Sequence, residues 1–214
     1  LPELLIMNTS NKDKIVRGAL SLFQAQGIKS VTMDKIAASL SVSKRTIYEH
    51  FADKEALVSE CLACFKRDYD LRREEIRRTT DNTFSYLLEV FRYSVSKMRV
   101  INVNFVSDAK AMFPEHVEAV KMNRRAQIAH IQEMIKKSQE EGHINKTFSS
   151  MVLAEVYYEM MNSLPSGVYD FTRTPASEVL RVLYNIYFRG VATEQGLVIM
   201  KNLLSGEEEN WKEE

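Results

Sequence analysis

Two basic residues and one hydroxyl-bearing residue stand together in the first turn of a short predicted helix. They are Lys44, Arg45 and Thr46, and Ser43 before them is a favoured residue for capping a helix. Lysine and arginine donate hydrogen bonds to guanine, while threonine contacts a thymine methyl group or a phosphate. The group therefore has the chemistry to read base edges in DNA, with Lys44 and Arg45 on guanine.

The elements around this group form a known supersecondary pattern. Thr32 can cap a helix over residues 33–40, residues 41–43 form a turn, and Ile47 and Phe51 share the inward face of the next helix. Two short helices with a short turn and a buried seam predict a helix-turn-helix. In that motif the first turn of the second helix meets base edges in the major groove.

Amphipathic helices flank this pattern on both sides. An apolar stripe with helical spacing predicts a helix over residues 11–26, with Ser10 as its cap and Gly27 as its end. On the other side, Asp53 can cap a longer helix that runs to about residue 78. The motif is therefore expected inside a small helical domain.

The composition bounds the fold class and the setting of the chain. Seven Gly and four Pro in 214 residues favour an all-α protein. The 29 Lys+Arg and 29 Asp+Glu cancel, so the net charge argues neither for nor against nucleic acid. Two cysteines cannot form a disulfide framework, and no apolar run approaches the ~20 residues of a membrane span. We expect a cytoplasmic protein with no membrane partner.

An enzyme or a metal site finds little support in the sequence. The chain lacks the GxxxxGK[ST] phosphate-binding pattern, the GxSxG nucleophile pattern and the HExxH metal-binding pattern. Its four histidines, at positions 50, 116, 130 and 143, are too far apart for a local ligand pair. Cys61 and Cys64 could sense oxidants, but buried free cysteines usually pack as small hydrophobic residues. We expect no catalytic residues, no metal and no cofactor.

The stretch from residue 31 to residue 57 resembles the amino-terminal DNA-binding domain of the TetR family of transcriptional repressors. In that family a helix ending in Gly precedes T-x-x-x-I-A, a turn, and S-x-x-T-[IL]-Y-x-[HY]-F-x-x-K-x-x-L. The resemblance covers residues 11–60 in detail and implies double-stranded operator DNA as the partner. The matching residues are Thr32, Ile36, Ala37, Val42, Ser43, Thr46, Ile47, Tyr48, His50, Phe51, Lys54 and Leu57.

The resemblance also implies which residues hold the DNA backbone. Tyr48, His50 and Lys54 match family positions that contact phosphates, and capped helix N-termini can offer amide groups to phosphates. Such contacts fix the register of the protein on DNA and carry no base sequence. The full predicted DNA-binding set is Thr32, Ser43, Lys44, Arg45, Thr46, Tyr48, His50 and Lys54.

Two residues depart from the pattern or are unusual in it. Ser41 stands before the Val of the turn, where the family usually has Gly, so a positive φ there would strain the backbone. Glu49 brings a carboxylate onto a helix expected to lie near phosphates. It could accept a hydrogen bond from a cytosine amino group, or it could point to solvent.

Longer helices with apolar stripes follow this region. The predicted organisation is an all-α chain whose second part is a larger ligand-binding and dimerisation domain. In family members the last two long helices pair with their copies, which implies a homodimer through helices of about 149–164 and 176–189. The predicted parts are a helix-turn-helix domain over 9–58, a linking helix of about 53–78, a helical domain over 79–206 and an acidic tail over 207–214.

The resemblance further implies a small-molecule effector held in the second domain. We therefore predict a sequence-specific DNA-binding regulator, a repressor that the effector releases from operator DNA. An alternative keeps the fold but makes the chain a regulator or helical interaction module controlled by a protein partner. The pocket candidates, which could equally be plain core residues, are Tyr86, Tyr93, Phe105, Met112, Phe113, His116, His130, Met134, Tyr157, Tyr158 and Asn162.

Overall fold

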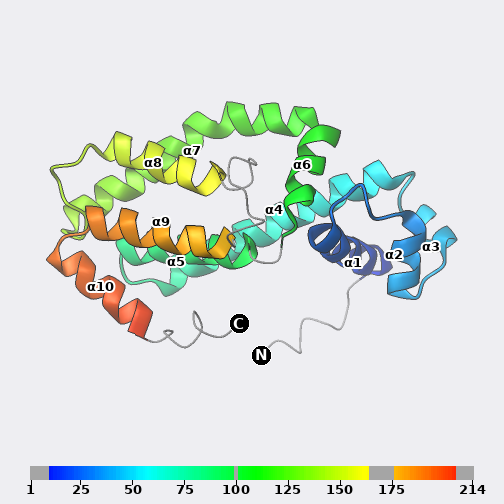
Figure 1. Ribbon diagram of the computed structural model, residues 1–214, viewed down its shortest axis with the longest axis horizontal. Coiled ribbons are helices and arrows are strands. Elements are labelled where there is room, and N and C mark those ends of the chain that lie inside the picture. The colour runs from blue at the N-terminus through cyan, green and yellow to red at the C-terminus, as the bar shows by residue number, and fades with distance from the viewer. Residues whose placement is uncertain (1–9, 99–100, 164–175, 206–214) are drawn as a thin grey trace. The chain divides into compact units, whose positions relative to one another are not determined.

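The computed structural model describes residues 10–98, 101–163 and 176–205 (Figure 1). Within these ranges the chain is helical, with no β-strand beyond an isolated bridge between Ile144 and Ala192, and the predicted all-α fold class is confirmed. None of the described helices is long and apolar enough to cross a lipid bilayer. The helices are α1 (Asn11–Gln26), α2 (Met33–Leu40), α3 (Lys44–Tyr48), α4 (Lys54–Thr79), α5 (Thr83–Met98), α6 (Val103–Met112), α7 (Pro114–Glu140), α8 (Ser150–Ser163), α9 (Ala176–Val191) and α10 (Glu194–Ser205).

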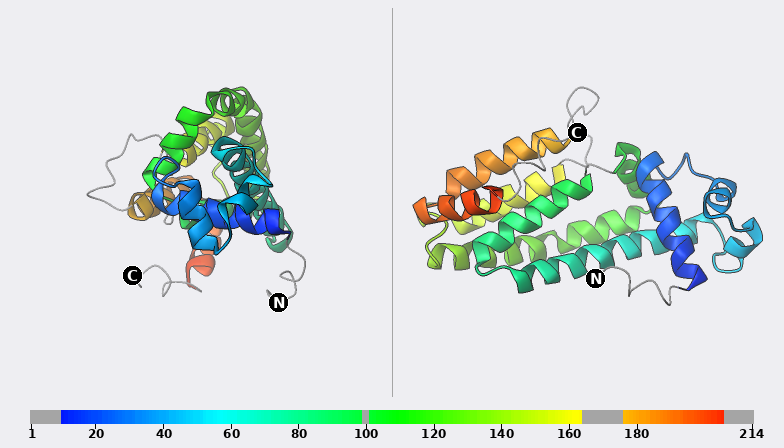
Figure 2. Two further views of the ribbon diagram at one scale, coloured as in Figure 1. Left: turned by 90° about the vertical axis from the view of Figure 1, so that its right-hand side faces the viewer. Right: turned by 90° about the horizontal axis from the view of Figure 1, so that it is seen from below.

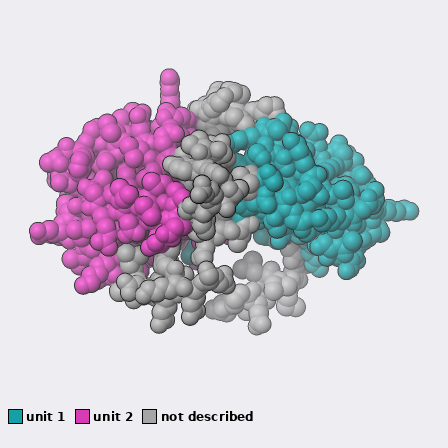
Figure 3. All heavy atoms as spheres, viewed as in Figure 1, with its two compact units in different colours: residues 1–72, 100–114 teal, residues 73–99, 115–214 magenta. Residues whose placement is uncertain are grey.

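The chain divides into two compact units (Figure 3). Unit 1 consists of residues 1–72 and 100–114, and unit 2 of residues 73–99 and 115–214. Helix α4 thus begins in unit 1 and ends in unit 2. The sequence places residues 79–206 in one domain, whereas the structure groups α6 with the amino-terminal helices.

Unit 1 is built around the seam of the helix-turn-helix. Phe23 of α1, Ile36 of α2 and Ile47 of α3 are fully buried in one apolar cluster, as is Leu57 of α4. Phe105 of α6 belongs to the same cluster. The predicted stripes therefore face a shared core, as the 3.6-residue period requires.

Helix α1 ends where the sequence predicts, at Gly27. This glycine has φ +83° and ψ 153°, a combination that is essentially confined to glycine. A Cβ atom at this position would lie 2.9 Å from the Cβ atom of Asn104 in α6. Glycine at position 27 thus permits both the backbone conformation of the turn and the close approach of α6.

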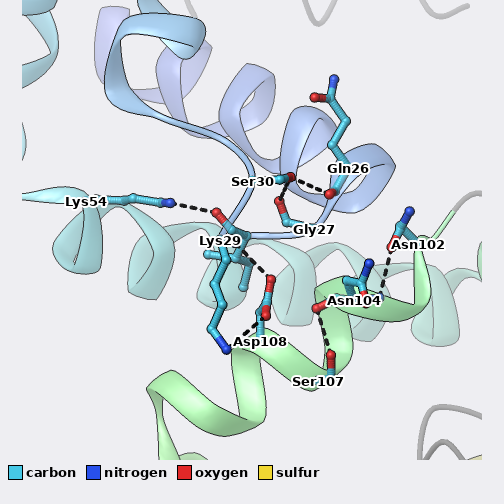
Figure 4. Close-up of polar contacts among 10 residues, drawn as sticks. Gln26, Gly27, Lys29, Ser30, Lys54, Asn102, Asn104, Ser107 and Asp108 are labelled. Atoms are coloured by element: carbon cyan, nitrogen blue, oxygen red, sulfur yellow. Dashed lines mark hydrogen bonds and ion pairs between the residues drawn. The ribbon is translucent and has the colours of Figure 1, made fainter.

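Helix α6 holds the α1–α2 loop through a buried carboxylate (Figure 4). Asp108 is 7% exposed and accepts a hydrogen bond from the Lys29 backbone N–H at 2.8 Å. Its other oxygen lies 3.4 Å from the Lys29 ammonium group. At the start of α6, the Asn102 backbone N–H donates to the Gln24 carbonyl oxygen at 2.6 Å. These contacts tie α1 and the loop that precedes α2 to α6 and to the residue that caps it.

Unit 2 has a separate core rich in aromatic side chains. Helix α9 packs along α5 (Figures 1 and 2), and Phe188 of α9 meets Phe91 of α5 edge to face, with ring centroids 5.7 Å apart. From α8, Tyr157 contacts both rings.

At the start of α5, the Glu141 carboxylate accepts hydrogen bonds from the Thr83 backbone N–H and hydroxyl at 3.0 and 2.8 Å. Unit 2 therefore forms its core without residues of unit 1.

Candidate nucleic-acid interface

Helices α2 and α3 are each held at their N-terminus by a hydroxyl cap. The Thr32 hydroxyl accepts a hydrogen bond from the Lys35 backbone N–H at 3.2 Å. The Ser43 hydroxyl accepts from the Thr46 backbone N–H at 3.0 Å and lies 2.8 Å from the Thr46 hydroxyl. The predicted caps are confirmed, and they engage the hydroxyls of three predicted DNA-binding residues in local hydrogen bonds.

The second helix of the motif is shorter than predicted. Helix α3 ends at Tyr48, so Phe51 lies beyond it. The Phe51 backbone N–H still donates to the Ile47 carbonyl oxygen at 3.0 Å, and both side chains are buried. The apolar seam therefore continues past the helix end and orients the opposite face of α3 to solvent.

The turn between the helices contains a residue in the left-handed conformation. Ser41 has φ +54° and ψ 38°, and it is the only non-glycine residue with positive φ in the described ranges. The Val42 backbone N–H donates to the Ala37 carbonyl oxygen at 3.0 Å, which closes the end of α2. The strain that the sequence anticipated at Ser41 is therefore present.

Replacing Ser41 with glycine should stabilise unit 1 by about 0.5–1 kcal/mol. Glycine adopts the left-handed conformation without strain, and this gain exceeds the loss caused by the greater entropy of glycine in the unfolded chain. Hydrogen exchange of the α2 and α3 amides measures the change. Ser39→Gly is the matched control, because Ser39 is exposed within α2 and glycine should destabilise a helix there. Equal loss of protection in both variants would show that the turn is unstrained.

The exposed face of α3 carries the predicted base-reading cations, each next to an acid. The Lys44 ammonium lies 2.9 Å from an Asp34 carboxylate oxygen, and this contact raises the pKa of Lys44. The Arg45 side chain is 89% exposed, and its Nε atom lies 3.2 Å from a Glu49 carboxylate oxygen. Lys44 and Arg45 are thus accessible to a partner, and each forms an ion pair with a carboxylate of the same chain.

The predicted phosphate contacts differ in their environments. Tyr48 is 45% exposed and His50 is exposed, so both can meet a ligand from solvent. Lys54 is half-buried, and its ammonium donates to the Ile28 carbonyl oxygen at 2.6 Å (Figure 4). Burial lowers the pKa of Lys54. Its role at phosphates stays a prediction, and in this structure it fastens α4 to the α1–α2 loop.

Sequence reasoning missed the residues of α6 that hold this loop. Asn104 and Asp108 contact Gly27 and Lys29, which precede them by more than 70 positions. Such pairings leave no local signature of spacing or composition. The sequence signal available was an acidic residue on a helix beside the apolar residues Phe105, Val106 and Ala109.

The predicted pocket residues fall into two groups. Phe105, Met112 and Phe113 pack in or against the core of unit 1. The side chains of His116 on α7 and Asn162 on α8 lie outside the described part of the structure. The candidates in unit 2 are Tyr86, Tyr93, His130, Met134, Tyr157 and Tyr158.

Around Tyr86 the environment is positively charged. Arg73 donates to the Tyr86 hydroxyl at 3.3 Å, and the Arg77 guanidinium lies 5.4 Å from the ring centroid. Burial, together with Arg73 and Arg77, lowers the pKa of the half-buried His130. Tyr157 and Tyr158 belong instead to the main aromatic core. This part of unit 2 therefore combines aromatic surface with cationic groups.

The two cysteines lie buried in the core of unit 1, an environment that disfavours reaction with oxidants. Both thiols are free and buried, and the Cys61 thiol donates to the Val16 carbonyl oxygen at 3.4 Å. Burial raises the pKa of Cys61 to about 12. Because the thiolate is the reactive species, a buried thiol with a raised pKa is unreactive near neutral pH.

The chain is similar to known proteins in the region of this motif. The family described as "Bacterial regulatory proteins, tetR family" matches residues 15–61. The HTH-type transcriptional regulator TcmR of Streptomyces glaucescens is 31% identical over 88 residues, 41% of this chain and 38% of TcmR. The negative transcriptional regulator IcaR of the biofilm operon icaADBC in Staphylococcus epidermidis is 30% identical over 81 residues, 36% of this chain and 44% of IcaR. The chain thus spans less than half the length of these relatives.

Solved structures share the fold over most of the chain. The ketosteroid transcriptional regulator KstR2 of Mycobacterium tuberculosis matches with a TM-score of 0.62 and 18% identity, over 88% of this chain and 98% of that one. A TetR-family regulator from Agrobacterium tumefaciens matches with a TM-score of 0.67 and 13% identity, over 85% and 97%. Residues 15–61 thus match the tetR family of bacterial regulatory proteins, and the solved structures show that the chain shares their helical fold.

Proposed function

We propose that the chain is a sequence-specific DNA-binding transcriptional regulator. The observation that carries the proposal is the orientation of α3, whose Ile47 is fully buried while Lys44 and Arg45 face solvent. One helix fits the major groove of B-DNA, and the first turn of that helix meets the base edges. A regulator of this kind would act in the cytoplasm on double-stranded operator DNA.

In this proposal some residues contact base edges and others contact the phosphate backbone. Arg45 and Lys44 donate to guanine, and Thr46 lies beside a thymine methyl group or a phosphate. Tyr48 and His50 hold the phosphate backbone, together with the capped N-termini of the helices at Thr32 and Ser43. Lys54 joins this group only if its ammonium leaves the Ile28 carbonyl oxygen.

An exposed apolar face on α8 and α9 supports a homodimer. Val152 and Val156 of α8 are 59% and 45% exposed, and Ile186 of α9 is 67% exposed. Around these residues α8 exposes Glu155 and Glu159, while α9 exposes Arg181 and Arg189. A two-fold interface that packs α8 on α9 of the other copy buries the apolar side chains and joins opposite charges. Two reading heads then meet half-sites about one DNA turn, or a multiple of it, apart.

We further propose that the regulator is a repressor released by a small molecule. IcaR is named as a negative regulator, which supports repression here. An effector weakens DNA binding only if it binds the DNA-incompetent arrangement more tightly. The aromatic and cationic surroundings of Tyr86 and His130 make this part of unit 2 the favoured region for it. In the alternative, a protein partner instead of a small molecule controls DNA binding. A loss of DNA binding on adding that partner would support this alternative.

Replacing Arg45 with alanine tests the proposed reading of bases. The binding duplex is selected from a random-sequence pool with the full-length protein, and binding is measured by gel shift at several salt concentrations. We expect a loss of about 1–3 kcal/mol on the selected duplex and relaxed preference at one base pair, because a bidentate contact to guanine disappears. Binding should also weaken steeply as salt rises.

The control for this substitution is Arg67→Ala. Arg67 is 58% exposed on α4 and lies near Glu60, with 3.5 Å between the charged groups. Its replacement should leave the affinity for the selected duplex within a factor of about two, the effect of an exposed ion pair. If Arg45→Ala costs the same on selected and scrambled duplexes, Arg45 does not read a base.

A further inference from the structure

The two cations that would enter the groove are both paired with acids of the same motif. Lys44 and Asp34 join the first turns of α3 and α2, with 2.9 Å between the charged groups. Arg45 and Glu49 lie one helical turn apart, with 3.2 Å between them. Asp34 is 71% exposed and Glu49 is 56% exposed. Neither carboxylate is needed to fill the core.

These carboxylates oppose DNA binding in a sequence-independent way. The phosphate backbone is negative, and in the major groove a carboxylate can accept hydrogen bonds only from the amino groups of adenine and cytosine, while the acceptor atoms of guanine, adenine and thymine repel it. A cation that turns to a phosphate must leave its acid, whereas Arg45 is paired through Nε and keeps its Nη groups free for a bidentate contact to guanine. The cost therefore falls on phosphate contacts, which every duplex offers, and is avoided where Arg45 reads guanine on the correct sequence.

We propose that Asp34 and Glu49 are specificity-determining residues that suppress binding to non-operator DNA by competing for Lys44 and Arg45. They act through those two cations and are therefore positioning residues. The proposal rests on the proposed function, because it requires that α3 binds DNA. Its effect is a larger ratio between operator and non-operator affinity, at the cost of some affinity for both.

The competition predicts a change in the salt dependence of binding. A cation that binds phosphate releases counterions from DNA, and the slope of log affinity against log salt is about −0.9 for each such contact. When a cation leaves a carboxylate to do so, that carboxylate takes up a counterion and part of the gain is lost. Removing the carboxylate should therefore steepen the slope by up to about one for each pair.

The test compares Asp34→Asn, Glu49→Gln and the double variant with the wild-type protein, using full-length chains. Each is titrated with the selected duplex and a scrambled duplex of equal length, over a range of salt concentrations. For the double variant we expect about 3–10-fold tighter binding to the scrambled duplex, a smaller gain on the selected duplex and a steeper salt slope. Both substituted side chains are exposed and keep their shape, so folding should be unaffected.

Asp70→Asn is the matched control. Asp70 pairs with Lys66 on α4 with the same one-turn spacing, at 2.8 Å, so the substitution removes one charge without freeing a cation of α3. It lies 16 residues from Lys54, about 24 Å along the helix at 1.5 Å per residue. Its salt slope and specificity ratio should match those of the wild-type protein.

Two results would overturn the inference while leaving the proposed function intact. The first is an effect of Asp34→Asn with Glu49→Gln no larger than that of Asp70→Asn. The second is a loss of affinity in Glu49→Gln that is confined to the selected duplex, since this would make Glu49 a direct base contact. If the wild-type protein shows no salt-dependent binding to any duplex, the proposed function itself is wrong and the inference fails with it.

Discussion

Replacing Ile186 with glutamate should separate the proposed homodimer into monomers. Ile186 is 67% exposed on α9, next to the exposed Val182 and close in sequence to Gly190, where a Cβ atom would meet nothing within 4 Å. In the proposed interface this surface is covered by the other copy, and an unpaired charge buried there costs several kcal/mol. The dimer dissociation constant should rise about 100-fold or more.

Sedimentation velocity over a range of concentrations measures this change, and gel shift measures its consequence for DNA. A monomer presents one reading head, so it cannot gain from two linked half-sites and should lose most of its affinity for the selected duplex. Helicity should stay unchanged, because the substituted side chain is solvent-exposed in the protomer.

Leu71→Glu is the matched control for this substitution. Leu71 is 69% exposed on α4, so the same change is made at the same exposure on a helix outside the proposed interface. Leu71→Glu should remain dimeric and bind the selected duplex as the wild-type protein does. An Ile186→Glu protein that stays dimeric would contradict the α8–α9 interface and show that another surface forms the dimer.

Replacing Gly27 with alanine should cost roughly 2–4 kcal/mol in the stability of unit 1. Alanine is disfavoured at φ +83° and ψ 153°, and its Cβ atom would lie 2.9 Å from the Cβ atom of Asn104. Either α6 moves away from the α1–α2 loop, or the loop changes its conformation. Both movements weaken the hydrogen bond between Asp108 and the Lys29 backbone N–H.

Hydrogen exchange resolved by peptide is the suitable measurement, because a chain with two units need not unfold in one step. Gly27→Ala should lower protection in α1, α2 and α6 and spare unit 2. Gly142→Ala is the control. Gly142 also has a positive φ, of +82°, but a Cβ atom added there would lie no closer than 3.4 Å to a neighbour, the Gln195 Oε1 atom. It should lose less protection, and only in unit 2. Unchanged protection of α6 in Gly27→Ala would show that the contact with Asn104 is not needed.

The helix-turn-helix could be predicted from the sequence almost residue by residue. Helices α1 and α2 begin and end where Ser10, Gly27 and Thr32 indicate, because caps and glycines act on the backbone of their own neighbours. The positive φ of Ser41 was anticipated from the family resemblance, because the family usually has Gly at this position. The spacing of Ile47 also predicted which face of α3 turns to solvent, and so placed Lys44 and Arg45 outward.

The sequence was less informative wherever contacts join distant parts of the chain. It assigned α6 to the second domain, yet Asp108 and Asn104 pack α6 against the α1–α2 loop. It grouped Phe105 with Tyr86 as pocket candidates, and the structure places these residues in different units. Apolar periodicity shows that a helix has a buried face, but it does not show which helix covers that face.

By itself, the sequence determined the all-helical class, the capped motif and the residues that it turns outward. All of these depend on interactions within about four residues along the chain, and those interactions leave a pattern in residue type and spacing. Only the tertiary structure decided that Lys54 turns to the Ile28 carbonyl oxygen, that Asp34 pairs with Lys44, and that α6 completes the unit that carries α3. Those outcomes depend on which side chains meet when helices and loops pack in space. Spacing and residue type along the chain do not indicate these long-range contacts.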